Sequence, residues 1–176
     1  MADRYSPAAD RRKPMNILYL TWNYPPARGG IEEMVYQLHV GLRQRGHLVH
    51  VVTAHGDAGT DEEQDVERAV RGGLMVFEVE AVRRGLRWGW RHRPDVVLCG
   101  SVASAPAGYL VARLLGVPYV VPAYGSELTL PGKAYRSMTH WLFRRAARVL
   151  PISRATAQRL CALGISDERC VVIPPG

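Results

Sequence analysis

The feature that most constrains the fold is an alternation of short apolar runs with longer segments of helical periodicity. Apolar runs rich in strand-forming residues occupy residues 16–21, 48–54, 74–79, 95–99, 118–122, 148–152 and 170–173. Apolar residues three and four apart recur in residues 31–45, 81–92, 102–115, 133–147 and 154–163. Strands that alternate with helices form βαβ units, and near-continuous apolar strands are typical of parallel sheets. We therefore predict an α/β, Rossmann-like, doubly wound sheet that is mainly parallel, with helices on both faces.

The 176 residues are enough for one domain, which we place at residues 15–176 after a flexible, polar lead-in at residues 1–14. The segment 56–71 is rich in Gly, Asp and Glu and indicates a surface excursion. The lead-in has no apolar core of a secretory signal, and no run approaches the length of a membrane-spanning helix. Cys99, Cys161 and Cys170 have no metal-binding spacing, so we expect a reduced, cytoplasmic protein.

Charge is distributed unevenly along the chain, whose net charge is +7. Residues 1–80 contain 9 basic and 12 acidic side chains, whereas residues 81–176 contain 14 basic and 4 acidic ones. A basic half favours an anionic partner, such as a phosphorylated small molecule, nucleic acid or an anionic membrane surface.

Ligands of doubly wound sheets bind at the carboxyl ends of the strands, where loops meet helix N-termini. The loops expected there cover residues 22–30, 55–59, 100–104, 123–132 and 153–154. In the first of them, Gly29 and Gly30 open a predicted helix, where free backbone N–H groups suit a phosphate or a sugar hydroxyl, and Arg28 adds charge. A tight turn that merely needs glycine explains the same pattern.

Several well-known sites are absent from the sequence. There is no G-x-G-x-x-G, and the second strand ends in Thr53-Ala54-His55 without an acid for a ribose. There is no Walker A loop, no G-x-S-x-G elbow and no histidine spacing typical of a metal site. These absences disfavour a nicotinamide-dependent dehydrogenase, a P-loop NTPase and a serine hydrolase.

Glu127 is one of two acidic residues between residues 81 and 166, and it lies in the loop after the fifth strand. A carboxylate at this edge can bind sugar hydroxyls or act as an acid or base, so Glu127 is a catalytic candidate. A helix-capping or Arg-paired carboxylate is the structural alternative.

Residues 83–93 contain five Arg, two Trp and no acid. Arg and Trp side by side are typical of a surface that contacts a membrane interface, and the candidates here are Arg83, Arg87, Trp88, Trp90 and Arg91. A solvated helix face with tryptophan packed on the domain is the alternative. A second basic amphipathic segment covers residues 135–148.

An ordered set of short motifs runs the length of the chain. They are Tyr24-Pro25-Pro26-x-x-Gly29-Gly30-Ile31-Glu32, Leu42-x-x-Arg45-Gly46-His47-x-Val49-x-Val51-Val52-Thr53, Arg93-Pro94-Asp95-Val96-Val97, Gly116-Val117-Pro118-Tyr119-Val120-Val121, Tyr124-Gly125-Ser126-Glu127, Ala147-x-Val149 with Ile152-Ser153, and Val171-Val172-Ile173-Pro174-Pro175-Gly176. Over about residues 15–176, this set resembles the N-terminal part of the GT-B glycosyltransferases of family 4, also called group 1.

The resemblance implies transfer of a sugar from a nucleotide-sugar to an acceptor with retention at the anomeric carbon. It implies no tightly bound cofactor and no metal requirement. Family members have two Rossmann-like domains, of which the N-terminal one mainly shapes the acceptor site and the C-terminal one holds most of the donor. The present chain would be the N-terminal domain, with its donor domain absent, and we expect it to be inactive alone.

The resemblance also implies roles for individual residues. The donor phosphate and sugar would meet Gly29, Gly30, Ile31 and Ser153. The acceptor would meet Asn23, Tyr24, Arg28, Tyr124, Ser126 and Glu127. Tyr124, the second catalytic candidate, stands where family members commonly have a histidine. A phenol positions a hydroxyl but does not carry a proton as imidazole does near pH 7.

The partners expected are therefore a nucleotide-sugar, a glycan, lipid-linked or small-molecule acceptor, the missing domain and an anionic membrane surface, with a cytoplasmic or peripheral inner-membrane location. A non-catalytic Rossmann-like module for nucleotides or phosphorylated ligands is the alternative. We expect no nucleic-acid partner, because the chain has no helix-turn-helix, RNP or zinc-finger signature.

Overall fold

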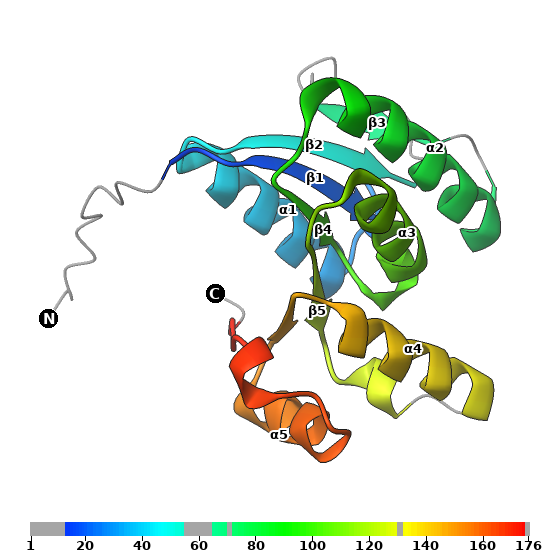
Figure 1. Ribbon diagram of the computed structural model, residues 1–176, viewed down its shortest axis with the longest axis vertical. Coiled ribbons are helices and arrows are strands. Elements are labelled where there is room, and N and C mark those ends of the chain that lie inside the picture. The colour runs from blue at the N-terminus through cyan, green and yellow to red at the C-terminus, as the bar shows by residue number, and fades with distance from the viewer. Residues whose placement is uncertain (1–12, 55–64, 70–71, 130–131, 175–176) are drawn as a thin grey trace, which may run out of the picture.

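The computed structural model describes residues 13–54, 65–69, 72–129 and 132–174. In these residues, a six-stranded sheet has the order β3-β2-β1-β4-β5-β6, and every neighbouring pair is parallel (Figure 1). The strands are β1 Asn16–Thr21, β2 Leu48–Thr53, β3 Val66–Arg68, β4 Val96–Cys99, β5 Tyr119–Ala123 and β6 Arg148–Pro151. This strand order is that of a Rossmann fold, so the predicted fold class is confirmed.

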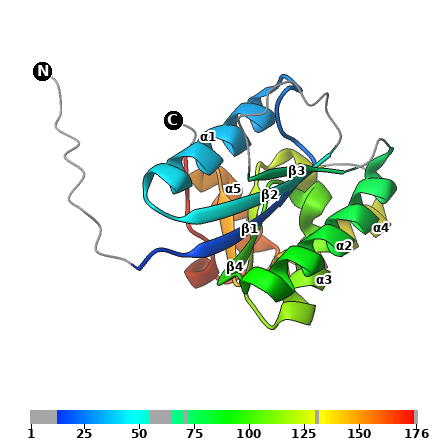
Figure 2. The ribbon, with the colours of Figure 1, turned by 90° about the horizontal axis from the view of Figure 1, so that it is seen from above.

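The helices cover the two faces of the sheet unequally. They are α1 Gly30–Gln44, α2 Leu74–His92, α3 Ala105–Leu115, α4 Lys133–Arg145 and α5 Arg154–Ala162, with short 3-10 turns η1 Val102–Ser104, η2 Ser126–Leu128 and η3 Asp167–Arg169. Figure 2 shows α1 on one side of the sheet and α2 and α3 on the other. The helices α2 to α5 contribute Phe77, Val111, Phe143 and Leu160 to one apolar core, and α1 contributes Val35 to the second.

Burial of β1 on both faces explains its continuous apolar sequence. Leu18 and Leu20 belong to the core under α2 and α3, while Ile17 and Tyr19 belong to the core under α1. Side chains alternate between the faces of a strand, so both sets must be apolar. Burying each of these side chains stabilises the fold by about 1.5–3 kcal/mol.

One predicted strand, at residues 74–79, is wrong. Residues 74–79 are the first turns of α2, whose buried stripe is Phe77, Ala81, Gly85 and Gly89. The third strand is instead Val66–Arg68, inside the segment predicted as a surface excursion. A short apolar run fits a strand or a helix equally well, and here packing against α3 selects the helix.

The predicted last strand is reduced to one bridge between Cys170 and Val149, followed by backbone hydrogen bonds from Val171 and Ile173 to the β6 chain. The predictions for residues 1–12 and for the loop 55–59 lie outside the described residues.

Candidate functional site

The C-terminal ends of β1, β4, β5 and β6 and the loops that follow them form one edge of the sheet, which we call the ligand edge. The parallel topology brings these loops together although they are up to 130 residues apart in the chain. The residues predicted to meet the donor or the acceptor, from Asn23 to Ser153, all lie in loops, short turns or helix starts on this edge.

A hydrogen-bond chain ties the β1 loop to α1 and to the β4 loop. Asn23 donates through Nδ2 to Oε1 of Glu32 at 2.7 Å, and its Oδ1 accepts from the Ser101 hydroxyl at 3.3 Å. The Thr21 hydroxyl donates to the Asn23 carbonyl at 2.7 Å. Asn23 is therefore held between three segments, and its position at the edge is set by tertiary contacts.

Tyr124 connects the β5 loop to the β4 loop. Its phenol donates to the Gly100 carbonyl at 2.7 Å. Burial, with a smaller contribution from the charge of Glu127, raises the pKa of Tyr124 well above its ordinary value. The hydroxyl thus stays protonated near neutral pH, and its oxygen can still accept a hydrogen bond from a ligand hydroxyl.

Glu127 is buried, with 6% of its surface exposed, and it stabilises its own turn. Its Oε1 accepts from the Tyr124 backbone N–H at 2.7 Å, and its Oε2 accepts from the Ser126 hydroxyl at 3.3 Å. Ser126 itself is exposed. This arrangement gives Glu127 a structural role and leaves the Ser126 side chain on the surface of the edge.

The start of α1 offers backbone donors. The residue before the helix is Gly29, and no side chain caps the helix by a hydrogen bond in the described residues. The first N–H groups of a helix have no partner within it and carry the positive end of the helix dipole. Gly29, Gly30 and the exposed Arg28 lie together here, with Ile31 in the first turn.

Ser153 caps α5 and has a structural function of its own. Its hydroxyl oxygen accepts from the Thr156 backbone N–H at 3.1 Å. Thr156 also packs on the η2 turn, since a Cβ added at Gly125 would lie 3.1 Å from the Thr156 hydroxyl oxygen. Ser153 is half-buried on the ligand edge beside that turn.

Tyr24 is not brought to the surface of the edge. Only 3% of its surface is exposed, and its hydroxyl contacts Nδ1 of His39 at 2.6 Å. Burial lowers the pKa of His39 to about 4, so the ring is neutral near pH 7. Tyr24 also packs edge-on against Tyr36, which makes it part of the core under α1.

The predicted Arg–Trp membrane residues divide into two groups. Arg83 forms an ion pair with Glu80 at 2.9 Å, and Arg87 forms one with Glu67 at 2.6 Å. The Trp88 ring stacks against both His50 and His92. Trp90 and Arg91 are exposed. The acids that neutralise the arginines lie outside the 83–93 segment, so its sequence did not reveal them.

A mainly apolar groove of about 690 Å³ extends from the ligand edge along the α1 side of the sheet. It lies where β4, β5 and β6 carry no described helix, and Tyr124 contributes to its wall. Its other walls include Tyr19, Leu38, Leu98, Leu150 and Ile173.

Sequence reasoning missed three residues of the edge. In the sequence, Glu32 stands out only as the end of the first motif, and Ser101 only as part of a loop. Arg68 donates to the Pro25 carbonyl at 2.9 Å and lies over the Tyr24 ring, yet it belongs to the unexpected strand β3.

In the described ranges, no three His, Cys, Asp or Glu side chains are grouped so that they could hold a metal ion. None of the described helices combines the length and apolar character needed to cross a bilayer.

A family model described as a glycosyl transferase 4-like domain matches residues 29–176. No curated protein matches the chain. Among solved structures, it is similar to Anabaena Alr3699/HepE in complex with UDP and glucose, at 20% identity and a TM-score of 0.70, over 92% of this chain and 44% of that one. It is also similar to UDP-GlcNAc 2-epimerase from Methanocaldococcus jannaschii, at 16% identity and a TM-score of 0.65, over 90% and 45% of the two chains.

A third similar structure is the apo form of the lipopolysaccharide outer core galactosyltransferase WaaB, at 16% identity and a TM-score of 0.64, over 91% of this chain and 45% of that one. The chain therefore spans less than half the length of these proteins. At such identities, the structures establish a shared fold.

Proposed function

Because the chain belongs to the glycosyl transferase 4-like domain family, we propose that it is the acceptor-side, N-terminal domain of a retaining glycosyltransferase. The enzyme would transfer a sugar from a nucleotide-sugar donor to a glycan, a lipid-linked sugar or a small molecule. A second domain, outside this chain, would bind most of the donor. The UDP and UDP-glucose complexes of the Anabaena neighbour support a nucleotide-sugar as the donor.

The observation that carries this proposal is the open start of α1 at the ligand edge. Gly30 has no side chain. A Cβ atom added there would have no atom of the described residues within 4 Å, apart from those of its neighbours in the chain and of the α1 backbone. A ligand can therefore reach the N–H groups of Gly30 and Ile31. A helix N-terminus of this kind stabilises the negative charge that develops on a departing diphosphate.

The acceptor would lie between the β1 and β5 loops. Asn23, Ser126 and Tyr124 present an amide and two hydroxyls on this part of the edge, and Arg28 is exposed beside it. Hydroxyl-rich acceptors bind through such neutral hydrogen-bonding groups. Tyr24 takes no part in this proposal, because its ring is in the core.

The reaction would need no dedicated base on this domain. Both oxygens of Glu127 accept hydrogen bonds within its own turn, and the raised pKa of Tyr124 keeps its phenol protonated. The departing diphosphate can take the proton of the acceptor hydroxyl as the glycosidic bond forms. The residues of this chain would then bind and orient the two substrates.

The test compares wild type with Gly30→Ala, both as this chain and joined to its donor domain. We expect no sugar transfer by the chain alone and transfer by the two-domain protein. In Gly30→Ala, the added methyl group would keep a ligand from the α1 N–H groups, so kcat/KM should fall about tenfold, as for loss of a transition-state hydrogen bond.

The unfolding free energy of Gly30→Ala should be unchanged, which separates a ligand effect from a folding defect. Transfer by the chain alone would contradict the proposal. Tight binding of a nucleotide-sugar by the chain alone, measured by calorimetry, would instead support a non-catalytic binding module.

A further inference from the structure

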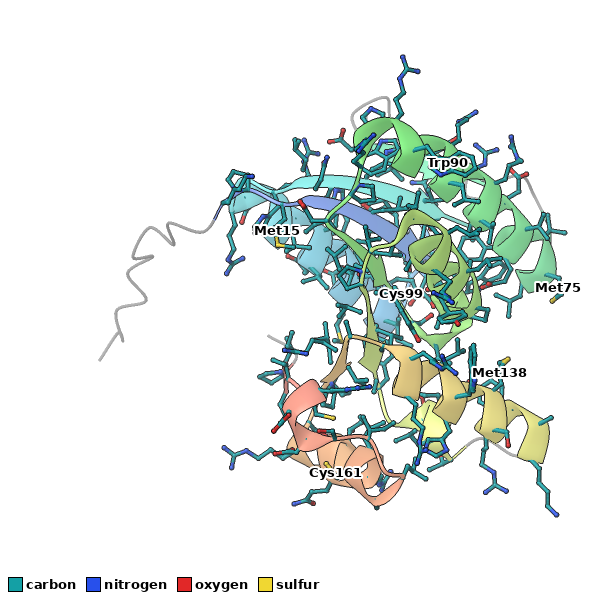
Figure 3. The ribbon with its side chains drawn as sticks, in the orientation of Figure 1. Met15, Met75, Trp90, Cys99, Met138 and Cys161 are labelled. Carbon is teal, nitrogen blue, oxygen red and sulfur yellow. The ribbon has the colours of Figure 1, made fainter. Side chains whose placement is uncertain are left out.

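Seven large apolar side chains lie exposed on the outside of the α2, α3 and α4 layer, away from the sheet. They are between 43% and 77% exposed, and we call them the outer helical face: Met75, Val79, Trp90, Leu110, Leu114, Met138 and Trp141. Figure 3 shows Met75 and Trp90 on α2 and Met138 on α4. Apolar patches that cover several elements mark binding surfaces.

Parts of the outer helical face on neighbouring helices are linked to one another. Trp90 of α2 and Leu114 of α3 line one hollow of about 330 Å³ near the C-terminal ends of these helices. Tyr109 of α3 packs edge-on against Trp141 of α4, with ring centroids 4.7 Å apart. Trp90, Leu110, Leu114 and Trp141 are thus grouped, because Leu110 and Leu114 are also neighbours one helical turn apart on α3.

The charge on these three helices is strongly one-sided. Together they carry nine Lys or Arg and two Glu, and α3 and α4 have no acid. Both glutamates are engaged within the fold. Glu78 accepts from the Ala107 backbone N–H at 2.6 Å, and Glu80 accepts from Arg83 and Arg84. The exposed charge is therefore basic, from residues that include Arg91, Arg113 and Arg145.

Arginine also lies beside the exposed aromatic ring. The Arg145 guanidinium is 5.3 Å from the centroid of Trp141. Exposed Trp with neighbouring Arg, next to aliphatic side chains, is the composition of surfaces that lie in the headgroup region of a bilayer. Apolar side chains such as Leu110 and Leu114 have no matching surface on a nucleic-acid backbone, and a symmetric dimer would place two basic faces against each other.

We propose that the outer helical face docks on an anionic lipid bilayer. The side chains of Trp90, Leu110, Leu114 and Trp141 enter the interface, and Arg91, Arg113 and Arg145 contact lipid phosphates. This surface differs from the one expected from residues 83–93 alone, because Arg83, Arg87 and Trp88 are engaged within the domain. The inference does not depend on the proposed function, since it concerns the helical layer and not the ligand edge.

The test is co-flotation of the chain with vesicles of phosphatidylcholine alone or mixed with phosphatidylglycerol. We expect binding to the anionic vesicles only, weakened by salt. The double variant Trp90→Glu/Leu114→Glu should lose at least about tenfold in the partition coefficient, because two interfacial side chains become charged. The control is Leu48→Glu/Val172→Glu, which makes the same charge change at exposed apolar positions outside the three helices and should bind nearly as wild type.

A second pair of variants tests the charge without altering apolar positions. Each arginine near an anionic surface contributes about fivefold to binding, so Arg113→Gln/Arg145→Gln should lose at least about tenfold. Arg154→Gln/Arg159→Gln, exposed on α5, is the matched control. If urea unfolding shows that Trp90→Glu/Leu114→Glu does not fold, the comparison of Arg113→Gln/Arg145→Gln with its control decides whether the outer helical face binds the vesicles.

Absence of binding to anionic vesicles would overturn the proposal. Equal losses in the variants and their controls would also overturn it. A dimer in sedimentation that Leu114→Glu dissociates would also overturn the proposal, if it occurs without vesicle binding. Duplex-DNA binding by these residues without vesicle binding would overturn it as well.

Discussion

The start of α1 and the η2 turn both place a glycine shortly before a glutamate at the ligand edge, but they use these residues differently. Glu127 is buried and binds the backbone of its own turn, whereas Glu32 is half-buried and accepts from the Asn23 side chain. Gly125 has a φ of +94°, in the left-handed region, whereas Gly29 is extended, with a φ of 174°. The turn is built to keep its shape, while the helix start leaves its N–H groups open to a ligand.

The largest effect is expected for Gly125→Val. A β-branched residue is strained at positive φ, and its Cβ would lie 3.1 Å from the Thr156 hydroxyl oxygen. The unfolding free energy should fall by about 3 kcal/mol in urea titrations. Gly30→Ala is the control and should unfold as wild type. An unfolding free energy of Gly125→Val equal to that of wild type would mean that the turn is not rigid.

Glu127→Ala should be the next most destabilising. It removes the acceptor of a partly buried Tyr124 N–H, and an unsatisfied buried donor costs about 2 kcal/mol. Exposed Glu33 accepts a hydrogen bond from the Gln37 side chain, so Glu33→Ala should cost a few tenths of a kcal/mol. Equal losses in the two variants would contradict the structural role of Glu127.

Glu78 is a third carboxylate that binds backbone, but it lies on α2 and accepts from the N–H of Ala107 on the neighbouring helix α3. Its other oxygen is buried without a partner in the described residues. Burial raises the pKa of Glu78 from 4.5 to about 7. The folded state therefore binds more protons between these values, and the unfolding free energy should fall as pH rises from about 5 to 8.

The measurement is urea unfolding of wild type and Glu78→Gln across this pH range. Between pH 5 and pH 8, the unfolding free energy of wild type should fall by about 1–2 kcal/mol more than that of Glu78→Gln. This figure is reduced for the partial exposure of the carboxylate. His39 changes stability with the opposite sign, because burial lowers its pKa to about 4, but it is common to both proteins and cancels in the difference. Parallel curves would contradict the role of Glu78.

Apart from the control variants, Gly29→Ala should have the smallest effect on stability. Its Cβ would lie 2.3 Å from Oε2 of Glu32, so the carboxylate would have to move away from Asn23. Loss of this hydrogen bond should cost about 0.5–1 kcal/mol. In a double-mutant cycle, Gly29→Ala should add little to Asn23→Ala. Full additivity would show that the two residues are not coupled through Glu32.

The helix α2 shows why some of the fold could not be predicted. Gly85 and Gly89 argue against a helix in the sequence, because glycine has low helix propensity. In the structure, they lie on its buried face, and a Cβ at Gly89 would be 2.4 Å from a Leu115 methyl carbon. Glycine lets α2 and α3 approach closely, a reason that becomes visible only when both helices are placed. The three-residue β3 has too short a pattern to detect.

The candidate site divides in the same way. The loops of the ligand edge follow from strand order in a parallel sheet, so Asn23, Gly29, Tyr124 and Ser153 could be placed there in advance. Burial of Tyr24 and the pairing of Arg87 with Glu67 could not, because they depend on segments far away in the chain.

The sequence by itself determined the fold class, the edge that carries the site and the family, because apolar periodicity, glycine positions and short motifs are local properties of the chain. Only the tertiary structure decided which glutamate holds a turn, which arginines are neutralised and which apolar side chains face outward. Those properties depend on contacts between distant residues, and burial and charge pairing take their values only once the helices and strands are packed together.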